Sequence, residues 1–247
     1  MSLIFRNRVL ASLDEIDRAA LEPHLAAVTL TKGAVLTEQD QAVDCVYFPE
    51  TADLANVMIF ADGRAVETST VGSEGVSGLA AFLAHAPCAW RITVQIGGSA
   101  WSLAADVFRK QVEASPALLK RALQLTHDYQ SQAAQTAACN AIHEVTPRLA
   151  RWLLLVQDRT NQVDMALTQS DIATLLGVQR TTINAAAAEL KTAGAIDYRR
   201  GRVRIQDRSV LRRVTCECYD AQRRRSEALG VVAERQLDDG IGSERRV

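Results

Sequence analysis

Apolar and polar residues alternate in short runs along the N-terminal half of the chain, from about Ala27 to Phe108. Turn-forming pairs separate the runs, and Asp62-Gly63 between two of them is the clearest sign of a hairpin. Many short strands at regular intervals are typical of an antiparallel sandwich or barrel. We expect strands at Ala34–Leu36, Cys45–Phe48, Leu54–Phe60, Ala65–Val71, Arg91–Ile96 and Ala100–Leu103, preceded by a helix that contains Leu13, Ile16, Ala19, Leu21 and Leu25.

The pattern changes to a helical one at Pro116, and neither Gly nor a further Pro interrupts the chain up to about Val145. Small or apolar residues recur there at three- or four-residue spacings, which predicts one face of a long helix. The alanine-rich second half lets a second helix approach closely, so the face suits a two-stranded dimer, although it also suits packing on the chain's own barrel. The face consists of Leu119, Leu123, Thr126, Ala133, Ala137 and Ala141.

Two shorter helices joined by a glycine turn are predicted between Thr168 and Ala193. Thr168 and Asp171 have the spacing of a helix cap, and Gly177 suits a left-handed residue at the helix end. The second helix has an inward apolar stripe from Ile183 to Leu190, and the hairpin pattern of 196–205 follows it. The order predicts a winged helix-turn-helix, which places its second helix in the major groove of DNA.

The outer face of the second helix supplies candidate DNA contacts, because Arg can bond guanine bidentately and Asn or Gln can bond adenine in the same way. An ordinary solvated polar face is the alternative, and the arginine-rich hairpin favours DNA. We expect base contacts from Gln179, Arg180, Thr181 and Asn184, and phosphate contacts from Thr168, Ser170, Thr182, Arg199, Arg200 and Arg202.

Charge is distributed unevenly between the two halves. Residues 1–146 contain 10 basic and 16 acidic residues, and residues 147–247 contain 18 and 13. The basic excess lies on the predicted helix-turn-helix and hairpin, as expected for a nucleic-acid-binding surface. No apolar run has the length needed to cross a membrane, so we expect no membrane contact.

The five cysteines are scattered and odd in number, which indicates a reducing cytoplasm. Cys216-x-Cys218 could bind a metal or form a redox pair, and Cys139 could share a metal with His143 one helical turn later. Two ligands do not make a site, so packing is the preferred interpretation and no metal is expected. We find no nucleophile with a base and no nucleotide-binding glycine motif, so an enzyme is not expected.

A glycine-rich turn at Gly72-Ser73-Glu74-Gly75 leads into a short apolar helix. Backbone N–H groups at such a helix start can bind an anion, although a purely structural turn is an equal alternative.

These features together resemble the Crp/Fnr family of bacterial transcription regulators, the cyclic-AMP receptor protein and its relatives. The resemblance covers roughly residues 8–213, and it is most specific from Leu167 to Leu190. Supporting matches are Val46-Tyr47-Phe48-Pro49, Asp62-Gly63 and Val71–Gly75. It implies an α+β chain with an N-terminal antiparallel jelly-roll barrel of the cyclic-nucleotide-binding kind, flanking helices, a long dimerisation helix and a C-terminal winged helix-turn-helix.

The resemblance also implies a function and partners. We expect a homodimer that binds a pseudo-palindromic operator in double-stranded DNA and contacts RNA polymerase. We also expect it to sense an unidentified small-molecule or nucleotide effector. Glu74 matches the glutamate that binds the ribose hydroxyl in nucleotide-binding relatives. The expected effector pocket contains Gly72, Glu74, Gly75, Arg91 and Thr93.

Departures from the family pattern narrow these expectations. Arg91 is followed by Ile92 instead of Ser or Thr, so the effector should not be cyclic AMP. Residues 1–30 contain no cysteine cluster for an iron–sulfur centre. Thr181 and Ala185 replace residues frequent in the family's recognition helix, so the DNA half-site should differ from the best-known half-sites of the family. The alternative is a regulator without ligand, whose barrel is a dimerisation or protein-docking scaffold.

The expected domain organisation follows from the same patterns. We expect a sensor barrel at 1–115, the dimerisation helix at 116–146, the winged helix-turn-helix at 147–213 and a polar tail at 214–247. Val145–Pro147 is the expected hinge between the sensor and the DNA reader, because Pro147 ends one helix and begins another.

Overall fold

The computed structural model describes residues 3–232. Its helices are α1 (Arg8–Ala11), α2 (Glu15–Leu21), η1 (Glu22–His24), α3 (Leu79–Leu83), α4 (Ala105–Ala114), α5 (Pro116–Ile142), α6 (Val145–Thr160), α7 (Gln169–Leu176), α8 (Arg180–Thr192), α9 (Arg208–Val214) and α10 (Cys218–Ala228). Its strands are β1 (Ala26–Leu30), β2 (Val35–Thr37), β3 (Cys45–Pro49), β4 (Asp53–Ile59), β5 (Ala65–Val71), β6 (Arg91–Ile96), β7 (Gly98–Ala104), β8 (Asp164–Met165), β9 (Ile196–Arg199) and β10 (Arg202–Ile205).

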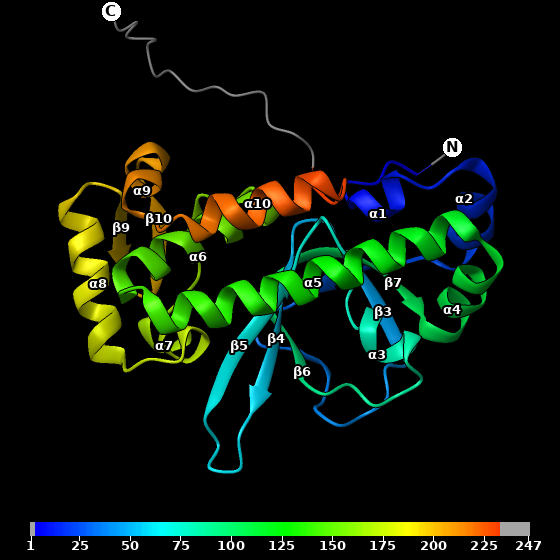
Figure 1. Cartoon of the computed structure of the whole chain (residues 1–247), viewed down its shortest axis with the longest axis horizontal. Coiled ribbons are helices and arrows are strands. Elements are labelled where there is room, and N and C mark those ends of the chain that lie inside the picture. The colour runs from blue at the N-terminus through cyan, green and yellow to red at the C-terminus, as the bar shows by residue number, and fades with distance from the viewer. Residues whose placement is uncertain (1–2, 233–247) are drawn as a thin grey trace, which may run out of the picture.

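The N-terminal region consists of two antiparallel sheets, with strand orders β1-β7-β3 and β2-β6-β4-β5 (Figure 1). All the strands expected from the alternating pattern are present, and Gly63 in the β4–β5 turn has a φ of 82° that favours glycine. The sheets enclose a core in which Phe48 and Phe82 pack against Phe108. The predicted α+β architecture is therefore confirmed, as a pair of antiparallel sheets with helices around them.

Helix α5 is long and lies along the outside of the sheets (Figure 1). It begins at Pro116, where Ser115 caps it by accepting a hydrogen bond from the Leu118 N–H. One face is buried in the N-terminal core through Leu118, Ala122 and Leu125. The helix both covers its own sheets and leaves a second face outward.

The break between α5 and α6 lies at His143 and Glu144, slightly before the predicted hinge at Val145–Pro147. Both residues have extended backbone and serve as the C-cap of α5 and the N-cap of α6. Pro147 lies inside the first turn of α6, where its missing N–H costs nothing. The helix-breaking signal was correct, and the break itself precedes the proline.

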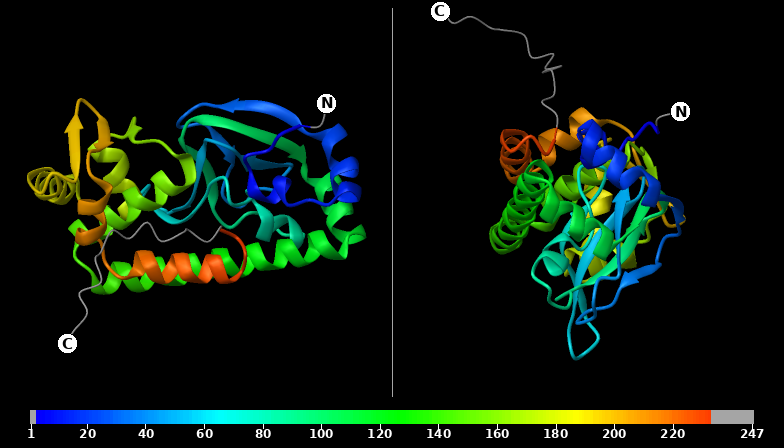
Figure 2. Two further views of the ribbon diagram at one scale, coloured as in Figure 1. Left: turned by 90° about the horizontal axis from the view of Figure 1, so that it is seen from above. Right: turned by 90° about the vertical axis from the view of Figure 1, so that its right-hand side faces the viewer.

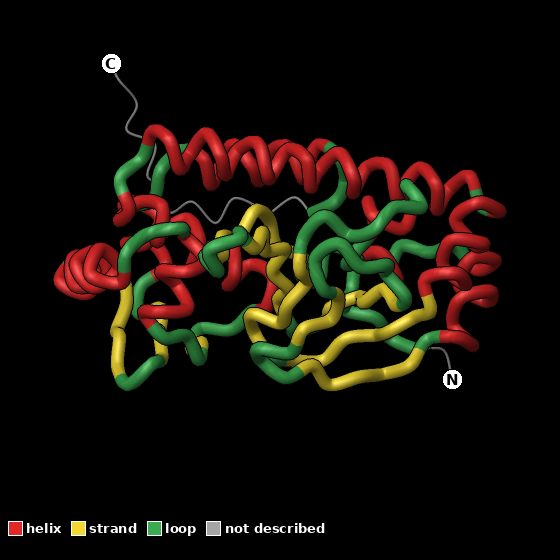
Figure 3. The backbone as a smooth tube through the Cα atoms, turned by 90° about the horizontal axis from the view of Figure 1, so that it is seen from below, coloured by secondary structure: helices red, strands yellow, loops and turns green. Residues whose placement is uncertain are grey.

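Helices α6 to α9 and the sheet β8-β10-β9 form a second core. Figure 3 shows a group of helices and short strands at one end of the molecule, beside the larger sheets. Helix α8 lies at the far end, beyond the sheets of the N-terminal region (Figure 1). Its inward stripe consists of Ile183, Ala186, Ala187 and Leu190, as predicted.

The first part of the expected polar tail at 214–247 contains a packed helix, α10. Helix α10 lies beside α5 and packs against it and α6 (Figure 2). Tyr219 is fully buried, and Ser226 donates a buried hydrogen bond to Asp128 of α5. The polar sequence hid this packing because the contacts are mostly hydrogen bonds, which leave no apolar stripe. The rest of the expected tail, residues 233–247, lies outside the described residues.

Candidate nucleic-acid interface and effector pocket

Helix α7 begins with a reciprocal capping box. The Thr168 N–H donates to Asp171 Oδ2 over 2.9 Å, and the Asp171 N–H donates to Thr168 Oγ1 over 3.1 Å. Two N–H groups that the helix leaves unpaired are thereby satisfied. Lys32, from the turn after β1, also donates to Asp171. The start of the helix-turn-helix is therefore linked to the N-terminal sheets.

The turn between α7 and α8 uses the predicted glycine. Gly177 has a φ of 65°, and a Cβ built there would lie 3.3 Å from Val66 of β5. The glycine thus serves both the left-handed turn and the close approach of that turn to the sheet. Trp152 of α6 donates its indole N–H to Glu67 of the same strand, 3.2 Å away. The helix-turn-helix region and the N-terminal sheets are therefore packed together through β5.

The four predicted base-reading residues are exposed at the start of α8: Gln179, Arg180, Thr181 and Asn184. Gln179 is the N-cap residue of α8 and makes no capping hydrogen bond through its side chain. Arg180 forms no ion pair with any of residues 3–232. These side chains are therefore available to an external partner.

The wing is the hairpin β9–β10, held to the helix-turn-helix by the Tyr198 hydroxyl, which donates to the Leu167 carbonyl over 2.8 Å. Its tip residues Arg200 and Gly201 have φ values of 49° and 75°. Arg200 is exposed and forms no ion pair within the described part of the chain. Arg199 pairs with Asp197, and Arg202 pairs with Asp164, so a phosphate would compete with these carboxylates.

The remaining predicted phosphate contacts are hydroxyl side chains. Thr168, Ser170 and Thr182 are all exposed. Thr168 Oγ1 already accepts the capping bond, and its hydroxyl proton stays free to donate.

The predicted effector pocket is not assembled as expected. Glu74 is buried and accepts hydrogen bonds from the Gly72 N–H and from Arg159 Nε of α6, 2.9 Å away. Arg91 instead pairs with Glu38 at the surface, and Thr93 donates to the Ala34 carbonyl. In this structure Arg91 and Thr93 therefore have partners other than Glu74.

Strand register accounts for the different partners of Arg91 and Glu74. In the sheet, Arg91 of β6 lies opposite Val57 of β4, and Val57 lies opposite Glu67 of β5. The glycine-rich turn follows Val71 of β5, which lies opposite Leu54 of β4. Arg91 is therefore several residues away from the turn along the sheet. A single sequence contains no signal for that register, because both strands alternate in the same way.

The backbone N–H groups of the glycine-rich turn already have acceptors inside the protein. The Gly75 N–H donates to Gly72, the Ser77 N–H to Tyr47, and the Val76 N–H to the Tyr129 hydroxyl at 2.9 Å. A Cβ at Gly75 would lie 2.1 Å from that hydroxyl, so α5 presses directly on the turn. The expectation of free N–H groups for an anion is not met at these three positions.

Sequence reasoning missed Arg159 and Tyr129, the two residues that close this turn. Both lie on helices far along the chain, and neither stands in a recognisable motif. A cavity of about 170 Å³ adjoins the turn between α5, α6 and α10. Its lining is strongly charged and includes Arg8, Glu74, Asp128, Arg159 and Arg223.

Two acids with raised pKa values lie beside this region, Glu67 partly buried and Asp53 fully buried. Desolvation raises the pKa of Glu67 to about 7, although the Trp152 hydrogen bond and the charges of Arg159 and Arg151 lower it. Desolvation also raises the pKa of Asp53, and neither carboxylate oxygen of Asp53 has a hydrogen-bond partner in the structure. The sheet surface facing α6 therefore carries acids that favour their neutral form.

Residues 147–214 match the family model of the Crp-like helix-turn-helix domain. The C-terminal region is therefore similar to the Crp-like helix-turn-helix domain. No curated protein sequence matches the chain.

Solved structures share the fold over most of the chain. A putative Crp/Fnr transcriptional regulator from Eubacterium rectale is 15% identical with a TM-score of 0.65, and the match covers 84% of this chain and 97% of that one. FixK2 from Bradyrhizobium japonicum is 18% identical with a TM-score of 0.64 and coverages of 78% and 98%. A putative cyclic nucleotide binding protein from Ruegeria pomeroyi is 19% identical, with a TM-score of 0.60 and coverages of 85% and 94%.

The predicted resemblance to the Crp/Fnr family is confirmed by the domain match and by the shared fold. At these identities the solved structures establish the fold alone. Within residues 3–232, no helix combines the length and the apolar character required to cross a membrane.

Proposed function

We propose that this chain is a homodimeric transcription regulator that reads a pseudo-palindromic operator with α8 and the wing of each copy. The observation that carries the proposal is the exposed set of polar side chains at the start of α8, on a Crp-like helix-turn-helix domain. A regulator of this kind acts in the cytoplasm and works at promoters with RNA polymerase.

The contacts divide into base reading and positioning. Arg180 at the start of α8 suits the guanine edge, and Gln179 and Asn184 suit adenine. Thr181 supplies a hydroxyl and a methyl group to the same part of the groove. Phosphates are held by the wing arginines 199, 200 and 202 and by the hydroxyls of residues 168, 170 and 182, which sets the register without reading sequence.

The outward face of α5 is the proposed dimer interface. Leu123 is 58% exposed and Leu119 is 41% exposed in the single chain. Ala137 and Ala141 continue the same face and are also exposed, while Thr126 and Ala133 are partly buried. Exposed apolar residues at helical spacing indicate a helix partner, and a second copy would place two readers one DNA turn apart.

The N-terminal sheets would control DNA binding through their contacts with the reader. The Trp152–Glu67 and Lys32–Asp171 hydrogen bonds, together with the Gly177 turn against Val66, support such coupling. An effector that favours one arrangement of these contacts would shift the population of DNA-competent dimers.

Two versions of the sensor role remain. The charged cavity of about 170 Å³ beside Glu74 and Arg159 favours a small polar effector. The occupied N–H groups of the glycine-rich turn favour a regulator without ligand, with the sheets as scaffold.

In a thermal-shift screen with cyclic nucleotides, cyclic AMP should leave the melting temperature unchanged, because Arg91 lies away from Glu74. A shift of several degrees at micromolar cyclic AMP would contradict this inference.

Selection of binding sites from a random duplex library tests the main proposal. The full chain should enrich a two-fold symmetric sequence and retain it in a gel shift at near-physiological salt. Competition with unrelated DNA separates specific from electrostatic binding. If no sequence competes better than random DNA, the proposal fails.

A further inference from the structure

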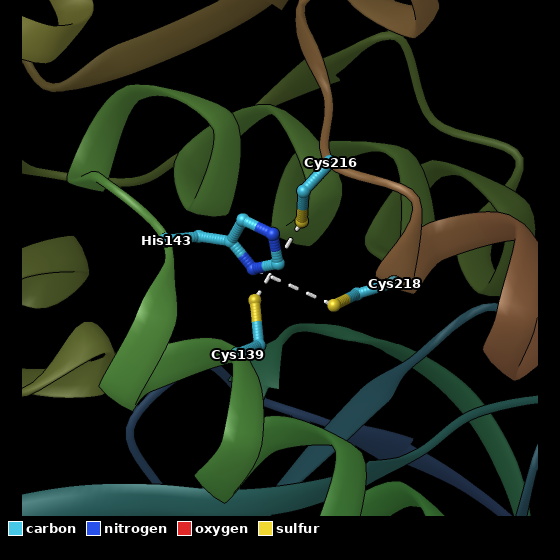
Figure 4. Close-up of side chains that lie close together, drawn as sticks. All are labelled: Cys139, His143, Cys216 and Cys218. Carbon is cyan, nitrogen blue, oxygen red and sulfur yellow. Dashed lines mark hydrogen bonds between the residues drawn. The ribbon is translucent and has the colours of Figure 1, made fainter.

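Four possible metal ligands from two distant segments meet next to the α5–α6 break. Cys139 and His143 lie one turn apart at the end of α5, and Cys216 and Cys218 lie at the start of α10. Their sulfur and nitrogen ligand atoms all lie within 4.8 Å of one another. Figure 4 shows the four side chains pointing toward a common centre.

Two of the separations are close to those of a mononuclear tetrahedral site. Cys139 Sγ lies 3.6 Å from Cys216 Sγ, and Cys218 Sγ lies 3.6 Å from His143 Nδ1. Bonds of about 2.3 Å to sulfur and about 2.0 Å to nitrogen give tetrahedral edges of about 3.8 Å between sulfurs and about 3.5 Å between sulfur and nitrogen. A disulfide requires about 2.05 Å between the sulfurs, so the four groups are spaced for a shared ion.

Neighbouring polar groups hold the ligands in orientations that suit a metal. His143 Nε2 lies 3.2 Å from Glu217 Oε1, so its other nitrogen, Nδ1, is left to face the sulfurs. Carboxylate partners of this kind accompany metal-bound histidines. Gln135 donates a hydrogen bond to Cys218 Sγ over 3.0 Å, as a donor to a thiolate would. Cys139, Cys216 and Cys218 are all buried.

We propose that Cys139, His143, Cys216 and Cys218 bind one Zn²⁺ ion per chain in a closed tetrahedral site. Three thiolates and one imidazole are a common donor set of structural zinc sites, and no position is left for a catalytic water. A cluster of two irons would need two ligand pairs on opposite sides, which a set confined within 4.8 Å does not provide.

The location gives the ion a structural task. His143 is the C-cap of α5, and Glu144 next to it is the N-cap of α6. Cys216 and Cys218 flank the start of α10, directly after the Crp-like domain ends at residue 214. The ion would therefore clamp the end of the reader domain to the end of α5. This inference does not depend on the proposed DNA binding.

Metal content of the full chain tests the proposal. After purification under reducing conditions without chelator and with supplied Zn²⁺, elemental analysis should find one zinc per chain. Cys216→Ser and His143→Ala should lose most of it, while the matched controls Cys45→Ser and His127→Ala should retain one equivalent. A chelator should lower the melting temperature of the wild type and of the controls but not of the ligand variants.

Spectroscopy of the wild type makes the test independent of whether the variants fold. Cobalt exchanged into the site should give the absorption of a tetrahedral thiolate complex, and X-ray absorption should show three sulfurs and one nitrogen around zinc. The proposal is overturned if the wild-type chain binds no zinc although a thiol titration shows its cysteines to be reduced. It is also overturned if the double variant Cys216→Ser/Cys218→Ser retains the zinc, or if the purified chain contains two irons and two sulfides.

Discussion

Arg159 of α6 binds Glu74 in the glycine-rich turn of the sheets, with Nε 2.9 Å from Oε1 and only 8% of either side chain exposed. Arg159 also donates to Gln132 of α5 over 3.1 Å. Three parts of the chain therefore meet at one guanidinium. The position where an effector glutamate was expected is used for an internal ion pair.

Removal of Arg159 should strongly destabilise the protein, because it leaves the Glu74 carboxylate buried without its partner. We expect Arg159→Met to lower the free energy of unfolding by about 3–5 kcal/mol, measured by urea denaturation. The control Arg64→Met removes an exposed pair with Asp62 and should cost less than about 1 kcal/mol. Equal losses in the two variants would show that burial does not strengthen the Glu74 pair.

Glu67 should make stability depend on pH. Its pKa in the folded chain is raised by burial to about 7 from 4.5, so folding favours the protonated acid. That contribution is fully present below about pH 4.5 and is lost as the pH rises to about 7.

The difference in unfolding free energy between the wild type and Glu67→Gln isolates this group. The wild type should lose roughly 2 kcal/mol relative to the variant between pH 4.5 and 7.5, because one pKa unit corresponds to about 1.4 kcal/mol and the side chain is only partly buried. Asp62→Asn, on an exposed turn, serves as the matched carboxylate-to-amide control. A constant difference for Glu67→Gln would contradict the raised pKa.

Arg180 and Arg200 should affect DNA binding in different ways. Arg180→Ala should weaken binding to the selected operator by about 1–3 kcal/mol and relax sequence preference at one position. Arg200→Ala, at the tip of the wing, should weaken binding to all sequences alike. It should also reduce the slope of the logarithm of the binding constant against the logarithm of salt concentration by about one. Titrations at several salt concentrations measure both effects. Uniform weakening by Arg180→Ala would reassign Arg180 to a phosphate.

Leu123→Glu should convert the dimer to a monomer, because it places a charge in the centre of the proposed α5 interface. The residue is 58% exposed in the single chain, so the monomer should remain folded by circular dichroism. Sedimentation should report half the mass, and operator affinity should fall sharply. Ile16→Glu, on α2 and 80% exposed, should leave mass and affinity unchanged. A Leu123→Glu protein of unchanged mass would exclude this interface.

Local patterns were sufficient to predict most of the elements. The strands, the Asp62-Gly63 hairpin, the capping box of Thr168 and Asp171 and the Gly177 turn all depend on neighbours in sequence. The physical causes of these elements act over a few residues. They are the alternation of apolar and polar residues, side-chain capping and the access of glycine to positive φ. The helix-turn-helix and its exposed polar face therefore followed from the sequence alone.

Tertiary structure decided which distant side chains meet. Strand register moved Arg91 away from Glu74, and the packing of α6 supplied Arg159 instead. The packing of α10 on α5 brought Cys216 and Cys218 to Cys139 and His143, two pairs that separately indicated no site. Such contacts depend on the relative placement of whole elements, which local sequence preferences do not determine.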